Sequence, residues 1–180
     1  MAESIILQAK EFACKRHAHQ FRPNKAKQPK TEHLEEVALL TQKAGGSQKA
    51  IAAAWLHDVV EDTETTLDEI DALFGDEIAS IVDGLTDPEP FAAMPLPKRK
   101  RMQTERLKEK SNDVRLVKIC DQISNVRSVL EDPPIENWDK AASLAYIEGA
   151  KQVVGVCKGL SAFLDQQFEA LYQQAYDKYS

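Results

Sequence analysis

The stretch Ile51-Ala-Ala-Ala-Trp-Leu-His57-Asp58-Val-Val-Glu61-Asp62-Thr63 joins an apolar run to a cluster of ionisable side chains. The run from Ile51 to Leu56 is apolar nearly all round a helix, which predicts a helix buried inside the protein. Ser47 precedes this run and is a typical N-cap residue. The sequence therefore predicts a buried helix that ends at His57 and Asp58.

Helical periodicity extends over most of the chain outside this stretch. Thr31 and Thr66 are further candidate N-caps, and the glycines near 45 and at 75 are candidate helix ends. Residues 18–30 and 87–97 are expected to be loops, and further helices are expected over about 113–131 and 136–178. No window alternates with period two between turn residues, so we predict no strands. We expect an all-α globule of about seven to nine helices that forms a single domain over residues 1–180.

The composition favours a globular protein without a membrane segment. Hydrophobic residues make up 43% of the chain and charged residues 29%, near the averages of globular domains. No apolar run approaches the ~20 residues that span a bilayer, and no secretory signal is visible. The three cysteines, Cys14, Cys120 and Cys157, form no CxxC pair, which favours reduced thiols. We therefore expect a cytoplasmic protein with no membrane partner.

Charged residues are segregated along the chain. Residues 58–89 contain twelve acids and no Lys or Arg, whereas residues 15–30 contain six Lys or Arg and no acid. Residues 97–110 contain seven Lys or Arg and two Glu. Carboxylates around a cation that face basic segments would suit a polyphosphate substrate, but solvated faces of unrelated helices would give the same counts. Nucleic-acid binding is disfavoured because the net charge is −6 and no Tyr or Phe lies among the basic residues of 98–110.

His57-Asp58 is the strongest local chemical signal. Imidazole and carboxylate ligands with open coordination positions suit a divalent metal such as Mn, Fe or Mg. Glu61 and Asp62 follow three and four residues after Asp58, and a carboxylate beside a metal site can act as the general base for a water. A hydrogen-bonded core histidine followed by a helix-end aspartate would explain the dipeptide without a metal. Both interpretations remain open on these residues alone.

His33 and Asp121 are candidates for further ligands. Asp121, Asn125 and Ser128 form a stripe among valines on the helix expected over 113–131, which favours burial over an ordinary solvent-exposed face. A buried carboxylate must be paired or must coordinate a metal. The chain has only four histidines, so a binuclear site that needs five cannot form. Neither a P-loop nor a dinucleotide fingerprint occurs.

These residues, taken in order, resemble those of a known family. His33, then HDxxEDT over 57–63, then Asp68 to Gly75 and the downstream DxxxN over 121–125 resemble the hydrolase domain of the RelA/SpoT proteins. The resemblance spans roughly residues 4–160. The length, without a synthetase or regulatory region, is similar to the stand-alone small alarmone hydrolases of this family, metazoan SpoT homologues among them. The resemblance implies an all-α HD-type fold that binds one Mn²⁺ per chain.

The resemblance also implies a role for individual residues. The metal ligands fall on His33, His57, Asp58 and Asp121, and Glu61 and Asp62 match the acidic pair that positions or deprotonates the attacking water. Substrate-binding positions fall on Arg22, Lys25, Lys98, Lys100, Arg101, Asn125, Ser128 and Tyr146. Departures from the family pattern, such as Leu34 in place of proline, lie toward the base-binding side. They leave the choice between guanine and adenine open.

The resemblance and the charge pattern together predict a Mn²⁺-dependent hydrolase that removes the 3′-pyrophosphate from guanosine alarmones, ppGpp and pppGpp. The adenosine analogues, ppApp and pppApp, are further candidate substrates. The alternatives are another HD phosphohydrolase, such as a nucleotidase or an NADPH 2′-phosphatase, and a catalytically silent nucleotide-binding protein. The presence of all four metal-ligand residues argues against a protein without catalytic activity. The basic segments argue for a substrate that carries several phosphates. The sequence predicts no oligomeric state.

Overall fold

The apolar run that begins at Ile51 forms helix α3 (Gln48–Leu56), which lies inside the molecule in the computed structural model. Every residue from Ala50 to Leu56 is buried. The Ser47 hydroxyl accepts a hydrogen bond of 3.0 Å from the Ala50 amide and so caps the helix. The predicted buried helix is therefore confirmed, and it ends directly at His57.

The structure describes residues 4–180, and in this range the chain is helical apart from its loops and two isolated β-bridges. Between residues 4 and 180, nine α-helices have eight residues or more, and α4 is a single turn. In chain order the elements are α1 (Ile5–Arg16), α2 (Lys30–Lys43), α3, α4 (Val59–Asp62), α5 (Leu67–Phe74), α6 (Asp76–Leu85), the 3₁₀ helix η1 (Glu89–Phe91), α7 (Leu96–Leu107), α8 (Asn112–Glu131), α9 (Lys140–Gly155) and α10 (Ala162–Tyr179). The predicted all-α class is confirmed, and the nine longer helices lie within the predicted number.

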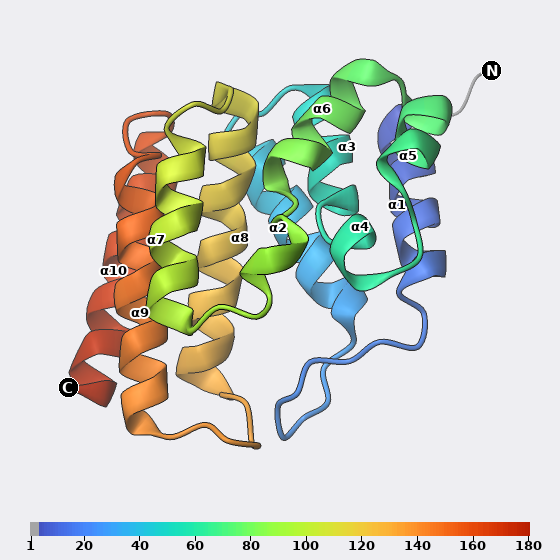
Figure 1. The fold of residues 1–180 in the computed structure, drawn as a ribbon. Coiled ribbons are helices and arrows are strands. Elements are labelled where there is room, and N and C mark those ends of the chain that lie inside the picture. The colour runs from blue at the N-terminus through green and yellow to red at the C-terminus, as the bar shows by residue number, and fades with distance from the viewer. Residues whose placement is uncertain (1–3) are drawn as a thin grey trace.

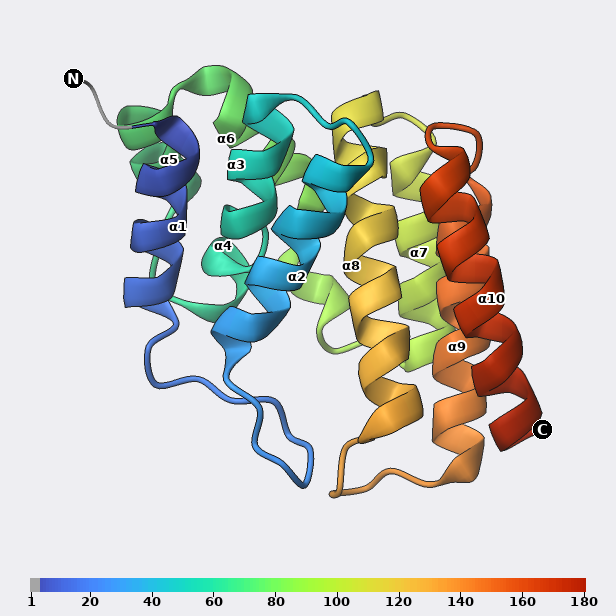
Figure 2. The ribbon, with the colours of Figure 1, turned by 180° about the vertical axis from the view of Figure 1, so that it is seen from behind.

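Helix α8 is the central element of the fold. It contacts α2, α3 and α6 on one side and α9 and α10 on the other, and twelve of its twenty residues are buried. Figures 1 and 2 show α1 to α6 grouped on one side of α8 and α7, α9 and α10 on the other. A polar residue on α8 can therefore lie between the two groups of helices.

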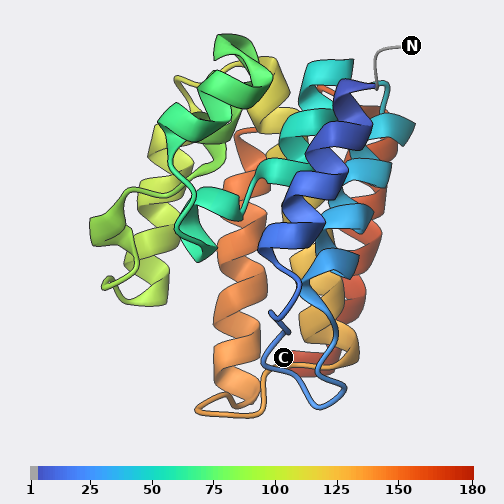
Figure 3. The same cartoon turned by 90° about the vertical axis from the view of Figure 1, so that its right-hand side faces the viewer.

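Two loops meet at one end of the helices. The loop after α1 pairs with the loop before α9 through a bridge between Asn24 and Pro134, and the Ile135 amide donates to the Pro23 carbonyl at 3.1 Å. Figure 3 shows the two loops side by side. These contacts fix the basic loop 17–29, which carries Arg22, against the C-terminal half of the fold.

Most predicted helix boundaries agree with the structure. Gly75 ends α5 with a φ of 87°, a conformation that favours glycine, and the Thr66 hydroxyl accepts from the Glu69 amide as a cap. The N-cap predicted at Thr31 is wrong, because Pro29 occupies the cap position and α2 begins at Lys30. The segment 87–97 is also not wholly a loop, since it contains η1 and the start of α7. Within the described residues, no helix combines the length and apolarity needed to cross a membrane.

Candidate active site

Four side chains from three separate parts of the chain converge at the centre of the fold. His33 comes from α2, His57 and Asp58 lie between α3 and α4, and Asp121 comes from α8. The two histidine Nε2 atoms are 3.1 Å apart. Asp58 Oδ2 lies 3.5 and 3.4 Å from them, and Asp121 Oδ1 lies 3.4 and 3.6 Å from them.

These separations fit a single divalent ion. Two ligand atoms about 2.0–2.2 Å from one ion, at angles of 90–110°, lie about 2.8–3.6 Å apart. The ligand atoms of His33, His57 and Asp58 all lie within 4.8 Å of one another. Asp121 Oδ1 lies near both histidine nitrogens and is a candidate fourth ligand. Two nitrogens and two oxygens suit a divalent metal of borderline or hard character. The assignment of all four residues as metal ligands stays a prediction.

Neighbouring cations keep the two aspartates ionised. Burial opposes ionisation of Asp58, but His57 and Lys30 outweigh it and hold the pKa of Asp58 well below its usual range. Burial likewise opposes ionisation of Asp121, but Lys118 outweighs it and holds the pKa of Asp121 well below its usual range. Lys30 Nζ lies 2.5 Å from Asp58 Oδ2, and Lys118 Nζ lies 3.4 Å from Asp121 Oδ2. Two carboxylates are thus available as anionic ligands.

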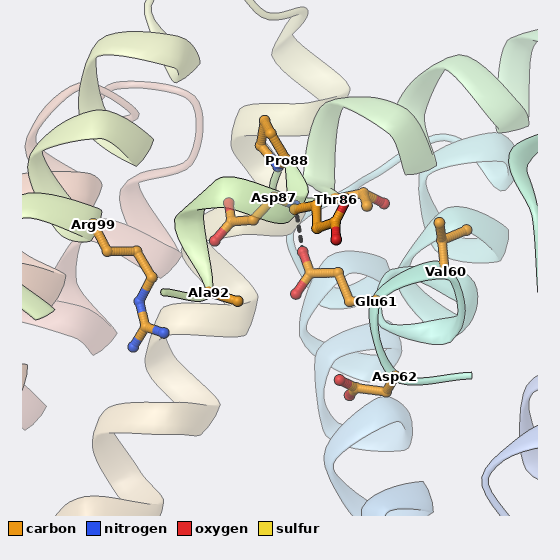
Figure 4. A pocket seen from close by; sticks show the side chains of 9 residues that line it. Val60, Glu61, Asp62, Thr86, Asp87, Pro88, Ala92 and Arg99 are labelled. Carbon is orange, nitrogen blue, oxygen red and sulfur yellow. Dashed lines mark hydrogen bonds between the residues drawn. The ribbon is translucent and has the colours of Figure 1, made fainter. Parts of the chain in front are cut away.

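Glu61 and Asp62 lie on α4, directly after the metal-ligand pair. The Asp87 amide donates a hydrogen bond to Glu61, and Figure 4 shows this contact on one wall of a pocket. Partial burial in that wall raises the pKa of Glu61 to about 7, although the amide of Asp87 opposes the shift. The Asp62 carboxylate lies 3.0 Å from Lys30 Nζ, and the Asp62 carbonyl accepts from Gln20 Nε2 at 2.7 Å. Both acids are therefore held in defined positions beside the cluster.

The cluster opens into a polar pocket of about 210 Å³. Its wall includes cations, acids, amides and one phenol: Lys30, His33, Asp58, Glu61, Asp62, Asp87, Arg99, Lys100, Gln103, Lys118, Asp121, Gln122, Asn125 and Tyr146. A second pocket of about 580 Å³ shares Glu61, Asp62, Asp87 and Arg99 with it. Figure 4 shows Arg99 reaching from α7 toward the acids of α4 across this second pocket. The arrangement combines a metal centre with several cations that can face phosphate oxygens.

Lys100 is buried, although lysine side chains are charged in most proteins. Its Nζ donates to Gln122 Oε1 at 2.9 Å and lies 4.6 Å from the centre of the Tyr146 ring. Burial, together with the charge of Lys118, lowers the pKa of Lys100 to about 7. Burial raises the pKa of Tyr146 to about 12, so the phenol stays protonated at neutral pH. Both side chains line the pocket, and their contact with the substrate stays a prediction.

The other predicted substrate contacts are divided between the pocket and the surface. Asn125 lines the pocket and donates to Asp121 Oδ1 at 2.8 Å. Arg22 lies behind it, with its guanidinium nitrogens 3.2 and 3.3 Å from Asn125 Oδ1. Arg22 and Ser128 line a small separate cavity of about 60 Å³. The side chains of Lys25, Lys98 and Arg101 are exposed and do not line the pocket, so their role stays a prediction.

Sequence reasoning missed several pocket residues. Lys30 and Lys118 each precede a ligand, His33 and Asp121, by three residues on the same helix. Residues three apart lie on one face of a helix, so this spacing could have identified both lysines. Arg99 lay within the predicted basic stretch but was not singled out. For Asp87, Gln103 and Gln122 the sequence offers no such signal.

An all-helical fold with a buried His/His/Asp/Asp cluster, flanked by acids and cations, defines the class of HD-domain proteins. The family model described as HD domain matches residues 9–147. The chain belongs to this HD-domain family and, within it, to the group of the MESH1 proteins. The predicted resemblance to the RelA/SpoT hydrolase domain is thereby confirmed.

The relatives align over nearly the whole chain. The guanosine-3′,5′-bis(diphosphate) 3′-pyrophosphohydrolase MESH1 of Homo sapiens is 35% identical over 94% of this chain and 93% of its own. The protein of the same description from Xenopus tropicalis is 33% identical with the same coverage. A solved structure, described as a metazoan ortholog of SpoT that hydrolyzes ppGpp, superposes with a TM-score of 0.87 at 26% identity and covers 97% of both chains. This neighbour confirms the predicted fold class.

Proposed function

We propose that this protein removes the 3′-pyrophosphate from ppGpp-type alarmones, with residues 1–180 acting as one HD-type phosphohydrolase domain. The observation that carries the proposal is the polar pocket, which joins three of the four proposed metal ligands, His33, Asp58 and Asp121, to Glu61 and to three lysines. A metal centre, a proton acceptor and a set of cations are the groups that phosphoryl chemistry needs. The relatives named as 3′-pyrophosphohydrolases support the same reaction.

We propose one Mn²⁺ per chain, held by His33, His57, Asp58 and Asp121. The donor set of two imidazoles and two carboxylates fits this ion among other divalent metals. Such an ion, when bound, lowers the pKa of water and polarises phosphate oxygens. Asn125 and Gln122 donate to the two oxygens of Asp121 at 2.8 and 2.9 Å. They orient this ligand toward the centre.

The reaction converts ppGpp and water into GDP and pyrophosphate. Glu61, with a pKa of about 7, accepts a proton from the attacking water at neutral pH. The water oxygen forms a bond to the phosphorus that carries the 3′-oxygen, and the bond between this phosphorus and the 3′-oxygen breaks. The 3′-oxygen takes up a proton as the nucleoside hydroxyl. Lys100, Lys118 and Arg99 line the pocket and stabilise the charge that develops on the phosphate oxygens.

The nucleotide is expected to contact Arg22, Asn125 and Tyr146, which come from three different parts of the chain. Arg22 suits a phosphate because its planar guanidinium donates two parallel hydrogen bonds. Lys25, Lys98, Arg101 and Ser128 remain predicted contacts. The adenosine analogues ppApp and pppApp stay candidate substrates beside the guanosine alarmones, and a cytoplasmic location remains the expectation.

A nucleotide panel tests the proposal. Purified protein with Mn²⁺ is incubated with ppGpp, ppApp, NADPH and GMP, and the release of pyrophosphate and of phosphate is measured separately. We expect pyrophosphate from the 3′-pyrophosphorylated nucleotides only and no release in the presence of a chelator. The Asp121→Asn variant is the control for the metal site. Phosphate from NADPH or GMP, without pyrophosphate from ppGpp, would instead identify another HD phosphohydrolase, and binding without turnover would identify a silent nucleotide-binding protein.

A further inference from the structure

The outer side of His33 contacts a chain of polar groups that runs from the buried Ser124 to the partly exposed Glu36. His33 Nδ1 lies 2.8 Å from Ser124 Oγ, and both side chains are only 2% exposed. Ser124 Oγ in turn donates to Glu36 Oε2 at 2.6 Å. Glu36 also forms an ion pair with Arg127. Ser124 thus connects the predicted metal ligand His33 to the carboxylate of Glu36, which does not line the pocket.

The direction of these hydrogen bonds follows from the groups themselves. A serine hydroxyl has one proton, and a carboxylate can only accept. Because the Ser124 proton goes to Glu36, Ser124 Oγ must accept from His33, and His33 Nδ1 must carry the proton. The lone pair of His33 then lies on Nε2, the atom that faces His57, Asp58 and Asp121.

We propose that Glu36 and Ser124 are positioning residues that hold His33 in the tautomer able to bind a metal. The inference rests on the metal site of the proposed function and deepens it. Outer hydrogen-bond partners of ligating histidines fix the tautomer and ring orientation, and their loss typically weakens metal binding by about 10–100-fold. Glu36 and Ser124 do not line the pocket of the metal centre, so we expect them to influence the metal through His33.

His57 is held by a different kind of partner. Its Nδ1 lies 2.6 Å from the Ala54 carbonyl oxygen, and a carbonyl accepts only, so His57 also carries its proton on Nδ1. This acceptor belongs to the backbone of α3 and cannot be removed by substitution. The acceptor of the His33 Nδ1 proton, in contrast, is the side chain of Ser124, which itself donates to the side chain of Glu36. His33 is therefore the ligand whose tautomer depends on residue identity.

Arg22 competes for the same nitrogen of His33. One guanidinium nitrogen lies 2.7 Å from His33 Nδ1, but a guanidinium has only donors. Arg22 can donate to Nδ1 only where that nitrogen has no proton. When Glu36 and Ser124 place the proton on Nδ1, Arg22 keeps Asn125 Oδ1 as its acceptor.

The first test is the dissociation constant for Mn²⁺, measured by calorimetry on the folded full-length protein. We expect Ser124→Ala and Glu36→Leu to raise it by about 10–100-fold. Glu36→Gln retains an oxygen that accepts from Ser124 and should stay within about threefold of the parent protein, well below the loss typical of a broken outer contact. The matched control is Glu35→Leu on the same helix, whose parent side chain is exposed and pairs with Lys10 at 3.4 Å; it should leave the constant unchanged.

The second test reads the tautomer of His33 directly from ¹⁵N–¹H spectra of the imidazole in the metal-free protein. We expect Nδ1–H in the parent and in Glu36→Gln, and a loss of this tautomer in Ser124→Ala and Glu36→Leu. If Glu36→Leu does not fold, Ser124→Ala carries both measurements, since it removes a single oxygen. Unchanged Mn²⁺ affinity and tautomer in Ser124→Ala overturn the proposal, and so does Glu36→Gln behaving like Glu36→Leu. Neither readout depends on which nucleotide is hydrolysed, so failure here is distinguishable from failure of the proposed function.

Discussion

At the scale of single residues, the two acids on α4 have different partners. The carboxylate of Asp62 lies 3.0 Å from Lys30 Nζ, whereas Glu61 accepts from the Asp87 amide and lines both pockets. A carboxylate engaged by a lysine is suited to hold a position, and one whose pKa is about 7 is suited to take up and return a proton. We therefore infer that Glu61 is the base and that Asp62 orients the site together with Lys30.

Glu61→Gln is expected to lower kcat by about 10²–10⁴, the usual contribution of general acid–base catalysis. Asp62→Asn should lower kcat less, and neither change should weaken Mn²⁺ binding greatly, because neither side chain is among the four ligands. Steady-state kinetics and calorimetric titration with Mn²⁺ measure the two effects. Near-parental kcat in Glu61→Gln, with the metal bound, would contradict the role of Glu61.

The pH dependence of kcat should reflect the same carboxyl group. Partial burial raises the pKa of Glu61 to about 7, so the group is protonated below this pH and cannot accept a proton. We expect kcat to rise as the pH increases through about 7 and this limb of the profile to be absent from Glu61→Gln. An identical limb in the variant would assign the titration to another group.

At the scale of helices, the approach of α7 to α9 positions Lys100. A Cβ atom added at Gly149 of α9 would lie 2.6 Å from Lys100 Cγ and 3.2 Å from Lys100 Cβ. The absence of a side chain at 149 is thus what allows the lysine to pass into the pocket. The same contact explains why Lys100 is buried while its neighbours Lys98 and Arg101 face solvent.

Gly149→Ala is expected to displace Lys100 and to raise KM for ppGpp. Overpacking costs about 1–3 kcal/mol, and replacing a helical glycine returns about 0.5–1 kcal/mol, so the free energy of unfolding should fall. Gly155→Ala is the control in the same helix, because no atom lies within 4 Å of a Cβ added there. Denaturant unfolding and KM measurements compare the two variants, and equal behaviour would refute the role of the contact.

At the scale of the whole molecule, the bridge between the loop 17–29 and the loop before α9 brings a distant basic segment to the site. Within this segment Arg22 points inward to Asn125, whereas Lys25 is exposed. The segregation of charge along the sequence therefore corresponds in part to a cleft and in part to a solvated surface. The polyphosphate-binding interpretation of the charge pattern therefore applies to Arg22, and the interpretation as a solvated face applies to Lys25.

Arg22→Ala should raise KM for a 3′-pyrophosphorylated nucleotide by roughly 10–100-fold, as expected for the loss of a hydrogen bond worth about 1.5–3 kcal/mol to a charged group. Lys25→Ala, in the same loop, should raise KM much less than Arg22→Ala, because the side chain of Lys25 is exposed. Added salt should weaken substrate binding, since exposed charges are screened over about 8–10 Å. Equal and negligible effects of both substitutions would leave the phosphates to other groups.

The sequence sufficed for much of this arrangement because its signals are local. The apolar run before His57 and the valines around Asp121 both require burial, and burial of polar groups requires a partner. The N-cap predicted at Thr31 failed because Pro29 precedes it. The exposure of Lys98 and the contact between Glu36 and Ser124 depend on which helices pack together, and no local pattern encodes that.

The position at which water attacks tests the central claim most directly. The protein is incubated with Mn²⁺ and ppGpp in ¹⁸O-labelled water, and the products are analysed by mass spectrometry. Attack on the phosphorus bound to the 3′-oxygen predicts one ¹⁸O atom in pyrophosphate and none in GDP. Labelled inorganic phosphate together with a nucleotide that retains a 3′-phosphate, or labelled GDP, would contradict the account.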